Sequence, residues 1–529
     1  MVTMERSTTI LVVCSIVLPV LFMVSTMYRN SISDLFGTLS KAKFLTRKVQ
    51  NVAELEIDDK NGLVNPVFDE RTCFSRFQSN LYRKISPQKP SPYLISKLRS
   101  YEDLHKYCGP HTESYNRTLK RLDSKNITST NCKYIVWIPA NGLGNRIISI
   151  ASSFLYALLT NRVLLINHGT DMDDLFCEPF PNTSWLLPKD FPLKNQFASS
   201  KLRYAHSLGS LLKSSATINN SKELKSPSFL YLNLGHGDYD LDQAFYCNQT
   251  QQALQKIPWL FLLSDQYFAP SFFLDPPFKQ EASKLFPEKE TVFNHLGNYL
   301  FNPSNQAWGL ITRFYQAYLA KADEKIGLQI RVFNVNATPF ERVMDQILSC
   351  TMQEKLLPEV DTKKESLPSP SKNPILKAIL ITSLYPEFYE NISNMYWTRP
   401  TVNGEVIEVY QPSHEEYQHF GDNMHNMKAW AEIYLLSLSD VLVISSWSTF
   451  GYVAQGLGGA KAWILSKPGH RNPPCQRAIS MEPCFHFPPR YNCSSKNKID
   501  SGDLAPYLRH CEDRRGGIKL VKDQEELQQ

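Results

Sequence analysis

The chain has 529 residues, of which 42% are hydrophobic and 20% charged, so a disordered or fibrous protein is excluded. The length excludes a single small domain and fits a large α/β protein with two lobes. Its 57 basic and 51 acidic residues give a formal charge of +6, which is mild for this length. Because neither a zinc-finger spacing nor an arginine-rich arm is present, we expect no nucleic-acid partner.

A membrane anchor is predicted at the N-terminus. Residues 7–28 carry no charged side chain, and at ~1.5 Å per residue they span roughly the 30 Å hydrocarbon core of a bilayer. The alternative is a cleaved signal peptide, whose apolar region usually runs only about 7–15 residues. We therefore expect a cytosolic tail over residues 1–6, an uncleaved anchor over 7–28 and a polar stem over 29–71.

Cysteines and N-glycosylation sequons favour a luminal location for the rest of the chain, as in a type II membrane protein. Of the 11 cysteines, Cys14 lies in the predicted anchor, and the even number that remains contains no Cys-x-x-Cys pair. Disulfides are therefore preferred to zinc sites. Basic residues after the anchor, counted alone, would instead place this part in the cytosol. The candidate glycosylation sites are Asn116, Asn126, Asn182, Asn219, Asn248, Asn336, Asn391 and Asn492.

Two strand–helix–strand series predict an α/β fold with parallel sheets. The first runs from a strand at 133–138 through a glycine-containing turn and a helix at 146–160 to a strand at 163–166. The second begins with alternating apolar residues at 326–333. It continues through strands at 375–382, 405–410 and 441–444 and a helix at 427–438. This alternation is typical of Rossmann-like lobes.

We expect the two lobes to face a cleft, with ligands where loops leave the carboxyl ends of the strands. The N-terminal lobe is predicted over residues 72–322 and the C-terminal lobe over 323–470. A cysteine-containing segment over 471–529 is expected to pack back on both. The run Thr338-Pro339-Phe340-Glu341 predicts a capping box with proline at the first helical position. Residues 360–373 are predicted to form a surface loop.

A turn between the first strand and the first helix is a candidate anion site. Its candidate residues are Gly142, Gly144, Asn145 and Arg146. Backbone N–H groups at such a helix N-terminus suit a diphosphate, whereas the alternative is a tight structural turn. Ile147 and Asn167 stand where an NAD fingerprint needs a glycine and an acid, so an NAD enzyme is disfavoured.

Arg331, near the end of the predicted strand at 326–333, is a more specific candidate. An arginine can donate two hydrogen bonds to a diphosphate and offset the charge of a leaving group. The alternative is an arginine paired with a buried carboxylate. A second turn, after the strand at 441–444, offers further hydrogen-bond donors for phosphate and ribose oxygens. The alternative is simple N-capping of the following helix, which needs only one of the hydroxyls in this turn. The candidates in this turn are Ser445, Ser446, Ser448, Thr449 and Phe450.

Asp265, after the apolar run at 258–263, is a candidate general base, and an acid bonded to loop amides is the alternative. Tyr267 follows it, and His425 and Asn426 open a helix. We expect these three to contact donor or acceptor, against the alternative of a solvated helix start. Asp171 and Asp173 resemble an Asp-x-Asp metal clamp, but we favour a solvated or capping cluster and expect no metal.

Long blocks of the chain resemble the plant xyloglucan-type fucosyltransferase family. These blocks are Leu98–Pro110, Gly142–Arg162, Asp174–Pro192, Ile257–Pro270, Ile326–Phe333, Lys428–Gly459 and Ser480–His486. The resemblance implies type II Golgi membrane proteins with a GT-B-like variant fold. In this fold the N-terminal lobe serves mainly the acceptor and the C-terminal lobe serves GDP-fucose. The resemblance also implies an inverting reaction without a required metal or other cofactor.

Residue by residue, the resemblance implies that Arg331 contacts the donor diphosphate. It also implies that 445–451 form the donor-binding turn and that 142–146 form a loop facing the cleft. Asn167 departs from the pattern, which has an aspartate there.

The expected reaction is transfer of L-fucose from GDP-fucose to O2 of a terminal galactose on a xyloglucan-like polysaccharide or an arabinogalactan. A transferase using another nucleotide sugar, such as GDP-mannose, is one alternative. A catalytically inactive membrane-anchored protein that binds glycans or partners a complex is another. We also expect a homodimer or a complex with other Golgi glycosyltransferases.

Overall fold

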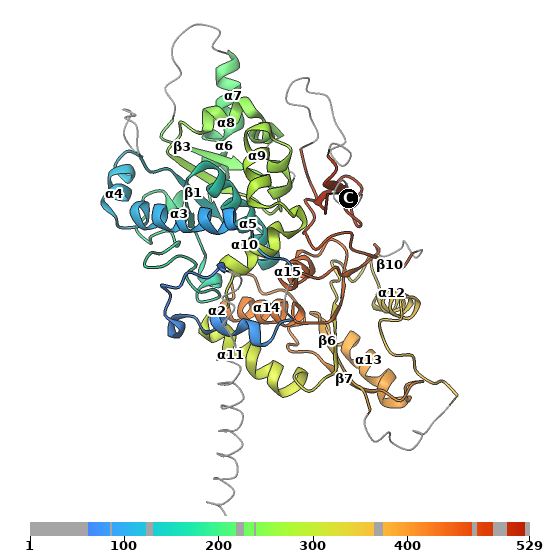
Figure 1. Ribbon diagram of the computed structural model, residues 1–529. Helices are drawn as coiled ribbons and strands as arrows, with labels where there is room; N and C mark the ends of the chain where they lie inside the picture. The colour runs from blue at the N-terminus through green and yellow to red at the C-terminus, as the bar shows by residue number, and fades with distance from the viewer. Residues whose placement is uncertain are drawn as a thin grey trace, which may run out of the picture. The chain divides into compact units, whose positions relative to one another are not determined.

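The computed structural model describes residues 62–84, 87–122, 131–217, 227–236, 240–363, 374–467, 473–489 and 505–523. These residues belong to one compact unit (Figure 1). The predicted tail, anchor and most of the predicted stem lie outside them, as do Asn126, Asn219 and Asn492. Most of the predicted loop at 360–373 lies outside them as well.

The first sheet has four parallel strands in the order β2-β1-β4-β3. They are β1 (Tyr134–Ile138), β2 (Val163–Ile166), β3 (Phe229–Asn233) and β4 (Trp259–Leu263). The apolar side chains of β1, β2 and β4 are all buried, as is usual for parallel strands covered on both faces. Helix α5 (Leu143–Thr160) connects β1 to β2, which confirms the first predicted series.

Helices surround this sheet, and a short helix precedes it (Figure 1). They are α2 (Phe74–Gln78), α3 (Pro92–Cys108), α4 (Glu113–Leu119), α6 (Ser200–Ala205), α7 (Leu208–Thr217), α8 (Asn248–Leu254), α9 (Pro276–Leu285) and α10 (Val292–Leu300). Helix α3 has proline at its first position, where the missing N–H costs nothing. Ser91 caps this helix, because its side chain accepts a hydrogen bond from the Leu94 N–H.

The second sheet has six strands in the order β10-β9-β8-β5-β6-β7, and β10 is antiparallel to its neighbour. The strands are β5 (Glu324–Gln329), β6 (Leu376–Thr382), β7 (Val406–Tyr410), β8 (Val441–Ile444), β9 (Trp463–Leu465) and β10 (Cys475–Arg477). Its helices are α11 (Asn305–Phe314), α12 (Phe340–Gln353), α13 (Glu387–Thr398), α14 (Asn423–Leu436) and α15 (Thr449–Gly458). A hairpin of β11 (Leu508–His510) and β12 (Ile518–Leu520) follows.

Two local predictions in the second series are wrong. Strand β5 ends at Gln329 rather than at Phe333, because pairing with β6 and β8 stops there. Arg331 therefore lies in the loop after the strand. The predicted capping box is absent, because α12 begins at Phe340 after Pro339 and no side chain caps its first turn.

The two sheets share one hydrophobic core. A single buried cluster contains Ile135 and Leu260 of the first sheet together with Leu380 and Ile444 of the second. Helices α5, α10 and α15 pack on one another where the sheets meet. Among the described helices, α5 alone is long and apolar enough to cross a membrane, but 78% of it is buried, so it is a core helix.

The described cysteines form disulfides and the described sequons are exposed, as expected if this part of the chain is luminal. The described disulfides are Cys73–Cys177, Cys108–Cys132, Cys350–Cys475 and Cys484–Cys511, and Cys247 is also disulfide-bonded. The sequon asparagines among the described residues, Asn116, Asn182, Asn248, Asn336 and Asn391, are all exposed. The predicted preference for disulfides over zinc is confirmed for these cysteines.

Candidate active site

Helices α5 and α15 begin next to each other, although they lie in different halves of the chain. A Cβ on Gly144 would lie 2.6 Å from Thr449 Oγ1 and 2.8 Å from the backbone nitrogen of Phe450, so only glycine fits there. Thr449 Oγ1 donates a hydrogen bond of 2.6 Å to Asn145 Oδ1. The two turns that the sequence singles out thus touch, and their helix N-termini converge.

A cavity of about 460 Å³ opens at this point, along the carboxyl ends of strands from both sheets. Its volume is in the range of small-molecule ligand sites. Ten of the predicted residues line it: Gly142, Gly144, Asn145, Asp265, Arg331, His425, Asn426, Ser448, Thr449 and Phe450. Ser448 is the N-cap of α15, but its hydroxyl makes no capping hydrogen bond, so simple capping does not explain this residue.

Arg331 places a partly buried positive charge in the cavity wall. Its backbone N–H donates to Ser445 Oγ (2.9 Å), and its Nη2 donates to Gln418 Oε1 (3.3 Å). Burial lowers the pKa of Arg331. Within the described ranges no carboxylate pairs with it, which removes the alternative that the sequence left open. A partly buried cation without a counter-charge favours an anionic ligand.

Four predicted residues do not line the cavity. Ser445 and Ser446 are buried, and Ser445 acts by holding the Arg331 backbone. The Tyr267 side chain is fully buried and donates to Glu482, so the expected substrate contact is wrong. Arg146 turns away from the cavity to pair with Asp171.

Asp171 links the turn at 142–146 to α14. Arg146 Nη1 lies 2.8 Å from Asp171 Oδ2, and Arg146 Nε donates to the carbonyl of Asn141 (2.9 Å). Asn426 Nδ2 donates to the Asp171 carbonyl (2.9 Å). Asp171 is 6% exposed, so the expectation of a solvated cluster is wrong for it. The Asp173 carboxylate oxygen Oδ1 lies 2.8 Å from His168 Nδ1.

The Asp265 carboxylate is saturated with donors. Oδ1 accepts from the His236 backbone N–H (3.1 Å) and from Gln266 Nε2 (2.8 Å). Oδ2 accepts from Asn141 Nδ2 (2.7 Å) and lies 2.5 Å from His236 Nδ1. Asp265 is 3% exposed, whereas the His236 side chain is 52% exposed and lines the cavity.

His425 belongs to a second polar cluster in the cavity wall. Its Nδ1 lies 3.0 Å from Glu415 Oε2, and Lys428 pairs with the other oxygen of Glu415. Hydrogen bonds from His425 and Lys428 lower the pKa of Glu415. Burial raises the pKa of the neighbouring Glu432 to about 8. Glu432 accepts a hydrogen bond from Ser413 and also lines the cavity.

The same cluster contains a possible metal-ligand set. Ligand atoms of Glu415, His419 and His425 lie within 4.8 Å of one another. Lys428 already pairs with Glu415 and competes with a cation for it. A second grouping, of Cys484 with His486 and Asp513, is excluded as a thiolate site because Cys484 is in a disulfide.

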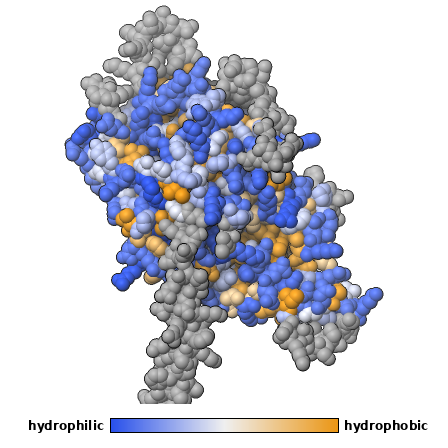
Figure 2. Space-filling view, viewed as in Figure 1, coloured by the Kyte–Doolittle hydropathy of each residue, from blue (hydrophilic) through white to orange (hydrophobic). Residues whose placement is uncertain are grey.

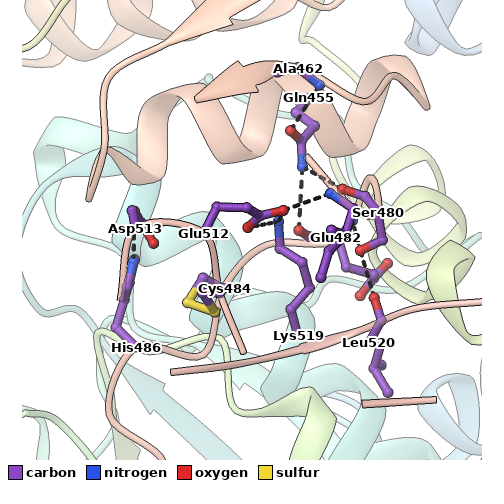
Figure 3. A network of polar contacts seen from close by, with 12 residues as sticks. Gln455, Ala462, Ser480, Glu482, Cys484, His486, Glu512, Asp513, Lys519 and Leu520 are labelled. Carbon is purple, nitrogen blue, oxygen red and sulfur yellow. Dashed lines mark hydrogen bonds and ion pairs between the residues drawn. A yellow bond between two sulfur atoms is a disulfide. The ribbon is translucent and has the colours of Figure 1, made fainter. Parts of the chain in front are cut away.

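The C-terminal segment contributes His486 and Phe487 to the cavity. Figure 3 shows how it is held: Gln455 of α15 bonds to Ser480 and Glu482, and buried Lys519 pairs with Glu512.

Asp513 ties this segment to the second turn. It accepts a hydrogen bond from His486 Nε2 (3.3 Å, Figure 3). It also accepts one from the Trp447 backbone N–H (2.6 Å). Although burial raises the pKa of Asp513, these hydrogen bonds lower it to about 2. The carboxylate is therefore an anionic link between the segment and the turn before α15.

Several lining residues were not singled out from the sequence. They are His236, Glu415, Gln418, Glu432, His486 and Phe487. None belongs to a strand-to-helix turn, and only Glu432 and His486 fall in blocks that resemble the family.

Comparison with known proteins gives consistent matches over most of the chain. The family described as xyloglucan fucosyltransferase matches residues 40–494. A galactoside 2-alpha-L-fucosyltransferase of Pisum sativum is 50% identical over 98% of this chain and 93% of its own. The protein of the same name from Arabidopsis thaliana is 54% identical over 96% of this chain and 92% of its own.

A solved structure agrees with these matches. It is an arginine-to-lysine variant of an Arabidopsis thaliana fucosyltransferase in complex with GDP. Its TM-score is 0.81 at 54% identity, over 88% of this chain and 100% of that chain.

Proposed function

Because this chain belongs to the xyloglucan fucosyltransferase family, we propose that it transfers L-fucose from GDP-fucose to O2 of a terminal galactose. The relatives' name, galactoside 2-alpha-L-fucosyltransferase, supports the linkage, and the GDP complex of the similar structure supports the donor. The observation that carries the proposal is Arg331, a partly buried cation without a counter-charge in the described cavity wall.

Arg331 and the two helix N-termini would hold the donor diphosphate. The first turns of α5 and α15 offer backbone N–H groups to an anion, and Arg331 offers a fork of donors beside them. Negative charge grows on the diphosphate as the bond to fucose breaks, so these donors stabilise the transition state more than the ground state. The arrangement supplies positive charge from protein groups, which supports a reaction without a required metal.

The acceptor would approach from the first sheet. Arg331 and α15 belong to the second sheet, whereas Asp265 follows β4 of the first sheet across the cavity. In a single displacement the attacking oxygen enters opposite the leaving group, which inverts the anomeric carbon from β to α. We therefore infer a GT-B-like arrangement, with the donor on the C-terminal lobe and the acceptor on the N-terminal lobe.

Exposed aromatic residues at the cavity suit a polysaccharide. Phe333 and Phe420 line the cavity, yet they are 65% and 75% exposed. Apolar rings of this kind pack against the C–H faces of sugars. Figure 2 shows a largely hydrophilic face with hydrophobic patches interspersed. A xyloglucan-like polysaccharide or an arabinogalactan is the proposed acceptor.

We also infer a type II Golgi membrane protein with its catalytic part in the lumen. The uncharged stretch at 7–28 supports the anchor. The disulfides and the exposed sequons among the described residues support an oxidising, glycosylating compartment. A protease-protection assay on microsomes checks this orientation, since a protected C-terminus is expected.

The reaction is tested with the full-length chain purified in detergent. Labelled GDP-fucose is offered with galactosylated xyloglucan, arabinogalactan and pectic galactan, and the product linkage is determined by NMR. We expect an α-(1,2)-fucosylated galactose, formed equally well in excess EDTA. Strict Mn²⁺ dependence would contradict the metal-free mechanism, and preferential use of GDP-mannose would contradict the donor. Binding of the glycans without turnover would favour the inactive alternative.

A further inference from the structure

Three histidines line the cavity, each is paired with a carboxylate, and they differ in exposure. The pairs are His236–Asp265, His425–Glu415 and His486–Asp513, at 2.5, 3.0 and 3.3 Å. The side chain of His236 is 52% exposed, whereas those of His425 and His486 are 7% and 8% exposed. Only His236 therefore has substantial surface available to a substrate hydroxyl.

His236 also lies on the side from which the acceptor must come. It follows β3, and Asp265 follows β4, so both extend from the sheet opposite Arg331. His425 opens α14 beside the second sheet, and His486 belongs to the segment bound to Trp447 at the start of α15. These two histidines lie on the side of the cavity that we assign to the donor.

Asp265 itself is poorly suited to remove a proton. An ionised carboxylate has about four acceptor positions. Those of Asp265 are taken by two contacts from His236, one from Gln266 and one from Asn141. Because the carboxylate can only accept, Nδ1 of His236 carries the proton, and Nε2 of the neutral ring is the acceptor. No residue in the described ranges hydrogen-bonds to that Nε2.

We propose that His236 is the general base of this fucosyl transfer and that Asp265 is its positioning residue. The inference rests on the proposed function. His236 Nε2 takes the proton of the galactose O2 hydroxyl while O2 bonds to C1 of fucose. The bond from C1 to the diphosphate oxygen breaks, GDP leaves with its electron pair, and Asp265 stabilises the imidazolium before the proton passes to water. Phe487, stacked on the ring at 5.0 Å, holds its orientation.

The test compares His236→Ala with His206→Ala in the full-length enzyme. His206 is a matched control, because it is an exposed histidine of the same sheet region whose ring also contacts a phenylalanine, Phe229, with the ring centroids 5.0 Å apart. We expect His236→Ala to lower kcat by about 10²- to 10⁴-fold with unchanged GDP binding. Added imidazole should restore part of kcat, which a purely structural residue would not allow. His206→Ala should keep wild-type kcat.

Asp265→Asn separates the two roles. If Asp265 acts only through His236, the double variant His236→Ala/Asp265→Asn has the kcat of His236→Ala alone. His236→Gln is a second variant in case alanine disturbs the loop, and retained GDP binding shows that each variant folds. A kcat of His236→Ala and His236→Gln within about threefold of wild type would overturn the proposal. So would a further large loss in the double variant without imidazole rescue. Absence of transfer by the wild type would instead refute the proposed function.

Discussion

Replacing Arg331 tests how this chain offsets the charge of its donor. Arg331 pairs with no carboxylate in the described structure, so a diphosphate supplies its missing partner. Each charge-assisted hydrogen bond contributes about 1.5–3 kcal/mol, and the guanidinium fork supplies two. Arg331→Ala should therefore cost about 3–6 kcal/mol of transition-state stabilisation, which is roughly 10²- to 10⁴-fold in kcat/KM. Arg331→Lys keeps the charge without the fork and should fall between alanine and wild type.

Two measurements check this reasoning. Initial rates at varied GDP-fucose give kcat/KM, and calorimetric titration with GDP gives the Kd. Arg342→Ala is the matched control, because Arg342 is an exposed arginine in α12 near the same sheet. The ligand-free Arg331→Met protein should be at least as stable as wild type, since a partly buried charge without a partner is removed. A kcat/KM and a GDP Kd of Arg331→Ala within fivefold of wild type would refute the reasoning.

Three further changes have defined outcomes. Gly144→Ala forces a Cβ against Thr449, and such overpacking should lower the free energy of unfolding by about 1–3 kcal/mol. We expect a lower Tm in thermal melts and a lower kcat/KM in initial-rate assays. Burial raises the pKa of Glu482 from 4.5 to about 8. The unfolded chain therefore loses this proton first, and the free energy of unfolding should fall by about 1.4 kcal/mol per pH unit as pH rises between these values. Glu482→Gln should flatten that decline in thermal melts from pH 5 to 9. Cys350→Ser with Cys475→Ser opens a loop of 125 residues and should cost about 5 kcal/mol, seen as a lower denaturant midpoint.

Buried strands were the most predictable part of the fold. The strands at 163–166 and 441–444 agree with β2 and β8 to the residue, because each is a compact apolar run between turn residues. The end of β5 is not predictable in this way. Ile330 and Val332 are as buried as strand residues, so the apolar alternation continues after the hydrogen-bonded pairing has stopped.

The site was predictable where it depends on local turns and not where it depends on long-range contacts. Local composition predicts the turns at 142–146 and 445–451. It does not predict that Asn145 and Thr449, 304 residues apart, hydrogen-bond to each other. His236 lies in a polar segment after β3 without a motif, and its importance appears only when Asp265 of another strand is placed beside it. Tyr267 is misassigned because a tyrosine beside a candidate acid is equally suited to a buried bond, here to Glu482.

The shared core of the two sheets limits how substrates enter and leave. Ile135, Leu260, Leu380 and Ile444 belong to one buried cluster, so swinging the sheets apart would expose apolar surface from both. A large hinge opening is therefore costly, at about 25 cal/mol for each Å² of apolar area exposed. GDP must instead depart through the existing mouth of the cavity. Turnover then depends on local side-chain movement there, and heating should unfold both sheets in one calorimetric transition.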